Sequence, residues 1–135
     1  MSSTWTRAEV LDEAGCMRLL DSVRWGRLAW SGPHGPRILP VNCSLVDGHV
    51  FLRTELYGSL AEAASGTDVA LEVDELDDRL SSGWSVVVLG RAEQVQDMDE
   101  VAAIFRHVRQ PWAPGSRPLL VRIIPSQVTG RRFLR

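Results

Sequence analysis

Apolar residues recur at every second position in several short segments of this sequence, and a strong hairpin turn joins two of them. Asp47-Gly48 separates the strand-like ranges Arg37–Val46 and His49–Thr54, and Asp-Gly is a preferred pair for a two-residue hairpin loop. The same pattern predicts strands at residues 24–30, 68–74, 84–95 and 119–124, and a seventh candidate at 128–134. With six to seven mostly antiparallel strands, the sequence favours a mainly β fold, a barrel with about three appended helices.

Three amphipathic segments predict helices that cover and close this barrel. Thr6-Arg7-Ala8-Glu9 fits a capping box, which predicts a helix over residues 7–22. Ser59-Leu60-Ala61-Glu62 fits a second capping box, opening a short helix that Gly66 closes. A third helix begins at Asp97 and stops before Pro111, and its predicted buried stripe consists of Met98, Val101, Ala102, Phe105 and Val108.

The length and composition of the chain indicate one domain, which we place at residues 1–135. No apolar run approaches the roughly 18 residues that a membrane helix needs, and the first residues lack the apolar stretch of a secretory signal. We therefore expect a cytoplasmic protein that does not enter a membrane. The net charge of −2 and the interspersed acids and bases oppose a role in nucleic-acid binding.

The residues that usually carry metal or nucleophilic chemistry form no known motif here. Cys16 and Cys43 lack CxxC spacing and the three histidines lack HxH or HExxH spacing, so neither a disulfide framework nor a metal site is predicted. Gly83-Trp84-Ser85-Val86-Val87 lacks the second glycine of GxSxG, which opposes a serine hydrolase. All fifteen basic residues are arginine, so any cationic contact with a phosphate must come from arginine.

Several segments, taken in order along the chain, carry a resemblance to a known family. They are Ile38-Leu39-Pro40-Val41-Asn42, Val50-Phe51-Leu52-Arg53-Thr54, Val69-Ala70-Leu71-Glu72-Val73-Asp74, Ser82–Glu93, Pro111-Trp112-Ala113-Pro114-Gly115 and the tail Val121-Arg122-Ile123 with Val128-Thr129-Gly130-Arg131-Arg132. Together they resemble the pyridoxamine 5′-phosphate oxidase-like family of FMN-binding split β-barrels, in particular its small actinobacterial-type members. The resemblance covers nearly the whole chain.

The resemblance implies a homodimer that holds FMN in a cleft between its two subunits. Leu39, Val41 and Asn42 would run along the isoalloxazine with main-chain groups, and Arg53 and Thr54 would meet the ribityl-phosphate end. A guanidinium and a hydroxyl suit phosphate oxygens, so Arg53→Ala should weaken FMN binding by about 1.5–3 kcal/mol.

Three further residues are assigned to the cofactor by the same resemblance. Ser59 stands where the family commonly carries a lysine, so the phosphate would instead meet helix amides and the Ser59 hydroxyl. Trp84 and Ser85 would face the phosphate or the partner subunit, the alternative being that Trp84 fills the barrel core. Trp112 would cover the ring from the other subunit, or else pack in the dimer interface.

The function implied by the resemblance is that of a flavin-dependent oxidoreductase acting on a small-molecule substrate that the sequence does not identify. Bound FMN would carry the redox chemistry, so no catalytic residue is assigned. Members of the family also use a deazaflavin or haem. The alternative is a split barrel with weak or lost FMN binding that serves as a ligand carrier, a flavin store or an interaction module, which the absence of the lysine favours.

Overall fold

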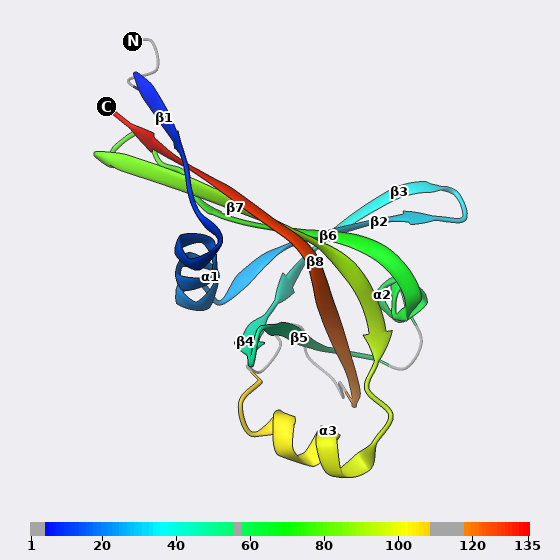
Figure 1. The fold of residues 1–135 in the computed structure, drawn as a ribbon. Helices are drawn as coiled ribbons and strands as arrows, with labels where there is room; N and C mark the ends of the chain where they lie inside the picture. Colours follow the sequence, from blue (N-terminus) through cyan, green and yellow to red (C-terminus); the bar gives the residue numbers. More distant parts are fainter. Residues whose placement is uncertain (1–4, 56–57, 109–117) are drawn as a thin grey trace.

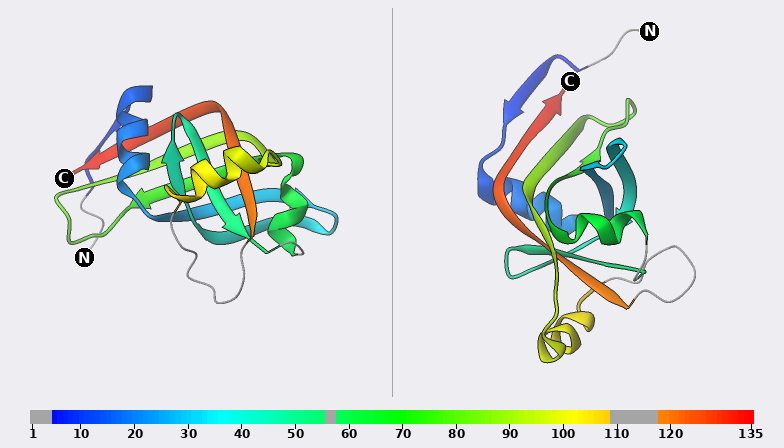
Figure 2. Two further views of the ribbon diagram at one scale, coloured as in Figure 1. Left: turned by 90° about the horizontal axis from the view of Figure 1, so that it is seen from below. Right: turned by 90° about the vertical axis from the view of Figure 1, so that its right-hand side faces the viewer.

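The computed structural model describes residues 5–55, 58–108 and 118–135, which form eight strands and three helices (Figure 1). In chain order these elements are β1 (Arg7–Val10), α1 (Glu13–Ser22), β2 (Trp25–Gly32), β3 (Gly35–Asn42), β4 (Ser44–Val46), β5 (His49–Thr54), α2 (Ser59–Ala63), β6 (Ser65–Glu75), β7 (Ser82–Gln94), α3 (Met98–Phe105) and β8 (Leu119–Leu134). All paired strands are antiparallel, in the order β3-β2-β6-β7-β8-β5-β4, and β1 pairs with β8. The β2–β3 hairpin projects on the side away from the two termini (Figures 1 and 2).

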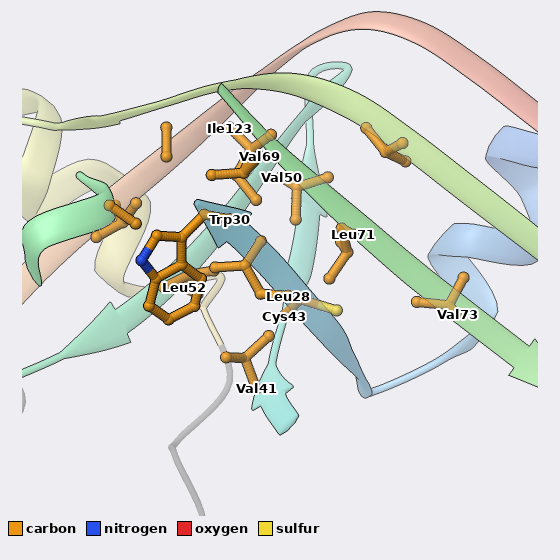
Figure 3. Packing of buried hydrophobic residues seen from close by; sticks show 14 of the residues in the cluster. Leu28, Trp30, Val41, Cys43, Val50, Leu52, Val69, Leu71, Val73 and Ile123 are labelled. Carbon is orange, nitrogen blue, oxygen red and sulfur yellow. The ribbon is translucent and has the colours of Figure 1, made fainter. Parts of the chain in front are cut away.

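Side chains alternate between the two faces of each strand, and those on the inner face of the curved sheet form the main core. Leu28, Leu71 and Val88 are direct neighbours across β2, β6 and β7, and all three are fully buried. Residues from β3 and β5, including Val41 and Leu52, pack into the same cluster (Figure 3). A second, smaller cluster lies between the sheet and α3, where Phe51 of β5 is the largest buried residue.

The first predicted helix is wrong over its first third. Residues 7–10 form β1, paired with the end of β8, and the helix begins only at Glu13. Asp12 is the N-cap, because its carboxylate accepts a hydrogen bond from the Gly15 amide at 2.7 Å. The amide of Thr6 donates to the carbonyl of Leu134 at 2.8 Å, so the predicted capping residue is already engaged in the sheet.

The second capping box is also wrong in detail. Gly58 is the N-cap of α2, and Ser59 is its first helical residue. The helix ends at Ala63, and Gly66 adopts a left-handed conformation (φ 84°) within β6 instead of closing the helix.

The buried stripe predicted for the third helix is only partly confirmed. Met98 is 76% exposed and Ala102 is exposed, whereas Ile104, which the prediction omitted, packs against the smaller cluster with Val101 and Phe105. Asp97 caps the helix by accepting from the amides of residues 99 and 100, which places Met98 in the first turn, outside the packed face.

The strand predictions need two corrections. The range predicted as one strand from Arg37 to Val46 is divided at Cys43 into β3 and β4, which lie at opposite ends of the strand order. Conversely, the predicted break at Pro125-Ser126 is absent, because β8 continues through it with a register shift against β7. These differences and the addition of β1 give eight strands in place of six or seven.

Candidate functional site

The predicted residues of β3 lie on an edge strand of the sheet. Leu39 and Val41 face the core side opposite Leu28 and Gly26, with Leu39 half-buried and Val41 buried. Asn42 points to the other side, and its side-chain amide donates to the carbonyl of Arg24 at 3.4 Å. Among the described strands, β3 ends the order, so one of its edges has no strand beside it.

Two prolines indicate which main-chain groups of β3 face this open edge. A proline nitrogen cannot donate to a ladder, so Pro36 and Pro40 belong to positions whose nitrogen points away from β2. By alternation, the amides of Ile38 and Asn42 point the same way. A cofactor beside this edge would therefore meet the main chain of Ile38 and Asn42, while Leu39 and Val41 offer their apolar side chains.

Arg53 and Thr54 lie side by side in sequence but on opposite faces of β5. The Arg53 guanidinium stacks on the Phe105 ring of α3, 4.3 Å from its centroid, on the side of the smaller cluster. The Thr54 side chain points toward the interior, as that of Leu52 two residues earlier does, and it is only 7% exposed. Thr54 thus shares the inner face with Leu39 and Val41, and Arg53 does not.

The structure says little about the roles predicted for Ser59 and Trp112. Ser59 opens the five-residue helix α2, which follows β5 and packs Leu60, Ala63 and Ala64 into the core. Trp112, predicted to cover the flavin ring, lies outside the described residues.

Trp84 and Ser85 lie at the opposite end of the sheet from Thr54. Trp84 is 8% exposed and belongs to the main core, while Ser85 pairs with Asp74 and Arg131 in neighbouring strands. Thr54, at the end of β5, pairs with Leu119 at the start of β8. The start of β8 lies beside Gln94, the last residue of β7, which is ten residues beyond Trp84. At roughly 3.3 Å per residue this is a path of about 33 Å, so one subunit does not bring the two groups into one site.

Sequence reasoning missed Arg37. It pairs with Trp30 across the β2–β3 hairpin and, two residues before Leu39, falls on the same face as Leu39 and Val41. The signal was present in the sequence, because the spacing Arg37-x-Leu39-x-Val41 has the period of a strand.

A charged cluster on the outer face of the sheet was also missed. The Arg27 guanidinium lies 3.4 Å from Glu72 and 3.2 Å from Asp74, and stacks on Trp25 at 4.9 Å. Partial burial raises the pKa of Glu72 to about 7, assisted by the hydrogen bond and negative charge of Asp74 and opposed by Arg27. The spacing Glu72-x-Asp74 within a strand predicts two carboxyl groups on one face, and this pair can hold a proton close to neutral pH.

Comparison with known proteins identifies the family to which the chain belongs. The model of the family described as pyridoxamine 5′-phosphate oxidase matches residues 12–132. The chain belongs to this family. Among relatives of known sequence, an uncharacterized Mycobacterium tuberculosis protein, Rv0080, is 40% identical over 129 residues, which are 92% of this chain and 84% of the relative.

Two solved structures resemble this family member closely. A Corynebacterium glutamicum protein superposes with a TM-score of 0.81 at 32% identity, covering 96% of this chain and 95% of its own. A FAD-binding protein from Mycobacterium smegmatis gives a TM-score of 0.78, also at 32% identity, covering 93% of this chain and 98% of its own. The predicted family and split-barrel fold are therefore confirmed, while the roles assigned to individual residues stay predictions.

The described part of this family member holds neither a metal-binding cluster nor a membrane-spanning helix. Within residues 5–55, 58–108 and 118–135, no group of three or more His, Cys, Asp or Glu side chains is arranged to hold a metal ion. None of the helices in the same part of the chain is long and apolar enough to cross a membrane.

Proposed function

We propose that this chain is a flavin-dependent oxidoreductase that binds a flavin nucleotide beside the open edge of β3. The observation that carries the proposal is the shared inner face of Leu39, Val41 and Thr54, with Arg37 at the end of the same row. Apolar side chains suit one face of an isoalloxazine ring, and a hydroxyl and a guanidinium suit phosphate oxygens. The FAD-binding relative at 32% identity supports the same class of cofactor.

The chemistry divides between the cofactor and the chain. A bound flavin would supply the hydride or electron transfer, as FMN in the prediction from resemblance or as FAD in the solved relative. The main chain of Ile38 and Asn42 would orient the ring, and Leu39 and Val41 would keep water from one of its faces. Thr54 would donate its hydroxyl to the phosphate end.

A homodimer fits this proposal because one subunit separates its predicted groups. Trp84 and Ser85 lie about 33 Å of strand away from Thr54, so a second copy is needed to bring both groups to one flavin. The outer face of the sheet exposes Ile38 by 64% and Leu89 by 40%, which is apolar surface that an association would cover. We also propose a cytoplasmic location, which agrees with two buried cysteines that form no disulfide.

One observation favours the second candidate, a carrier or interaction module with weak flavin binding. Arg53 stacks on Phe105, so it does not face the interior with Thr54. Together with serine at position 59, this leaves fewer cationic groups for a phosphate than the resemblance implies.

The test is a titration of the full chain with FMN and with FAD, followed by flavin and tryptophan fluorescence, with native mass spectrometry of the same samples. Saturable quenching at micromolar concentration or below, on a particle of twice 15.0 kDa, is the expected result. A folded dimer that binds neither flavin would exclude the flavin-dependent oxidoreductase and favour the carrier or a relative that uses a deazaflavin or haem.

A further inference from the structure

Exposed apolar side chains gather on the outer face of the central sheet. Four neighbouring strands each contribute one large hydrophobic residue that is between 38% and 64% exposed, namely Trp25, Ile38, Leu89 and Ile124. A hollow of about 540 Å³ opens on the same face, with Ala29 and Ala70 in its lining. A hollowed apolar surface of this kind is typical of a protein contact, so this is the face that the proposed homodimer would cover.

A charged cluster interrupts this apolar surface. Leu71 and Val73 of β6 point into the core, so Glu72 and Asp74, which alternate with them, point to the outer face (Figure 3). Arg27 of β2, which pairs with Glu72, lies 3.4 Å from its carboxylate and 3.2 Å from that of Asp74. The cluster therefore holds two carboxyl groups and one guanidinium, which leaves an excess of one negative charge when both acids are ionised.

The surroundings of Glu72 do not balance this excess. On β7 its neighbour is Val87, which carries no charge. Within the described part of the chain, the ion pairs of Glu72 and Asp74 are all with Arg27. The next charges on the outer face are further from the cluster: Arg131, which is separated from Asp74 by Ser85, and Asp68 with its neighbour Arg91, four residues along β6 from Glu72.

Contact with a second copy would remove the water that now solvates these carboxyl groups. The side chains of Glu72 and Asp74 are 34% and 23% exposed, so solvent reaches both. Partial burial and the nearby Asp74 already raise the pKa of Glu72 to about 7. Covering the face would raise this pKa further, because desolvation disfavours the charged form of a carboxyl group. Association would therefore take up a proton wherever Glu72 is ionised in the free copy.

We propose that self-association through the outer face is linked to proton uptake at Glu72, so that the dimer tightens as the pH falls from 8 to 6. The proposal rests on the homodimer of the proposed function. Linkage is reciprocal, so a dimer that favours the protonated carboxyl is itself favoured where that carboxyl is protonated. With one Glu72 in each copy and a pKa of about 7 in the free copy, the dimer Kd changes by at most about a hundredfold over this range.

The experiment measures subunit exchange between dimers that carry donor or acceptor dyes, without flavin, at pH 6, 7 and 8. An amine-reactive dye labels the α-amino group alone, because the chain contains no lysine. Fluorescence transfer gives the dissociation rate even for a tight dimer, and sedimentation velocity over a dilution series gives the oligomeric state. We expect the wild-type dimer to dissociate at least about tenfold faster at pH 8 than at pH 6, since affinity changes act mainly on dissociation.

Three variants, each checked for folding by circular dichroism, assign the proton and the surface. Glu72→Gln keeps the size of the side chain but cannot ionise, so its dissociation rate should vary by less than about twofold with pH and match the wild-type rate at pH 6. Glu75→Gln, an exposed position that pairs with Trp84 and so faces the other side of β6, is the matched control and should keep the wild-type pH dependence. Leu89→Asp places a charge on the apolar surface and should weaken the dimer at every pH.

The outcomes separate the proposal from the proposed function. A wild-type dimer whose dissociation rate does not depend on pH, or a Glu72→Gln dimer that keeps the full dependence, overturns the proton linkage and leaves the homodimer in place. In the second case the proton belongs to another group, such as one of the three histidines. A Leu89→Asp dimer as tight as the wild type overturns the placement of the contact on the outer face, and a wild type that is monomeric at every pH overturns the homodimer as well. The flavin titration of the same samples is read separately and decides the flavin assignment.

Discussion

Substituting Glu72 by glutamine tests the charged cluster on the outer face of the sheet. In the folded chain partial burial and Asp74 raise the pKa of Glu72 from 4.5 to about 7. The folded state therefore holds a proton that the unfolded state releases between these values, and stability falls as the pH rises from about 4.5 to about 7. At 1.36 kcal/mol per pH unit the upper limit is about 3.4 kcal/mol. The Glu72 side chain is 34% exposed, so we expect solvent screening to leave about 1 kcal/mol.

The assay is urea unfolding of both proteins at pH 5, 6, 7 and 8. A glutamine side chain cannot ionise but keeps the size of the glutamate, so Glu72→Gln should match the wild type at pH 5 and exceed its free energy of unfolding by about 1 kcal/mol at pH 8. Glu75→Gln, an exposed position at the end of the same strand, is the control and should retain the wild-type pH dependence. Parallel curves for the wild type and Glu72→Gln would refute the reasoning, because the extra proton would then belong to another group.

Three further substitutions test the fold and the proposed site. In Gly90→Ala, the new Cβ would lie 2.9 Å from the carbonyl carbon of Ile124 in β8, so we expect a loss of at least about 2 kcal/mol in urea unfolding; wild-type stability would mean that the two strands separate easily. Removing the cap of α1 in Asp12→Ala should cost about 1 kcal/mol, and an unchanged thermal midpoint would contradict its capping role. Thr54→Val should weaken flavin binding by about three- to tenfold, more than Arg53→Ala does; the reverse order in a fluorescence titration would return Arg53 to the phosphate site.

The elements that the sequence predicts best are those in which local chemistry and long-range pairing agree. Asp47 and Gly48 both have positive φ (50° and 79°), and Val46 pairs with His49, as a two-residue hairpin loop requires. The helix predicted from Thr6 failed because a local signal competes there with a long-range strand pairing. The capping box favours a helix, but pairing with the end of β8 outweighs it, and Leu134 is 128 residues away from Thr6 in sequence. A local motif carries no information about such a partner.

The site was predictable to the extent that strand alternation determines it. Leu39 and Val41 are two residues apart and share a face, as their spacing predicts. The contact of Arg27 with Glu72 and Asp74 depends on the register between β2 and β6, which the sequence does not contain. The open edge of β3 similarly follows from the order of the strands, although its two prolines are a local sign of an edge.

Adjacency in sequence and adjacency in space diverge most clearly at Arg53 and Thr54. Consecutive side chains of a strand point to opposite faces, so a pair of neighbouring residues on β5 cannot both contact a single phosphate on one face. The Arg53 guanidinium instead lies on Phe105, which makes it part of the packing of α3. On the inner face, the cationic group that the strand period brings into line with Leu39 and Val41 is Arg37, on another strand. A phosphate site in this fold is therefore better sought among residues of β3 and β5 that share the inner face than among residues that share a short motif.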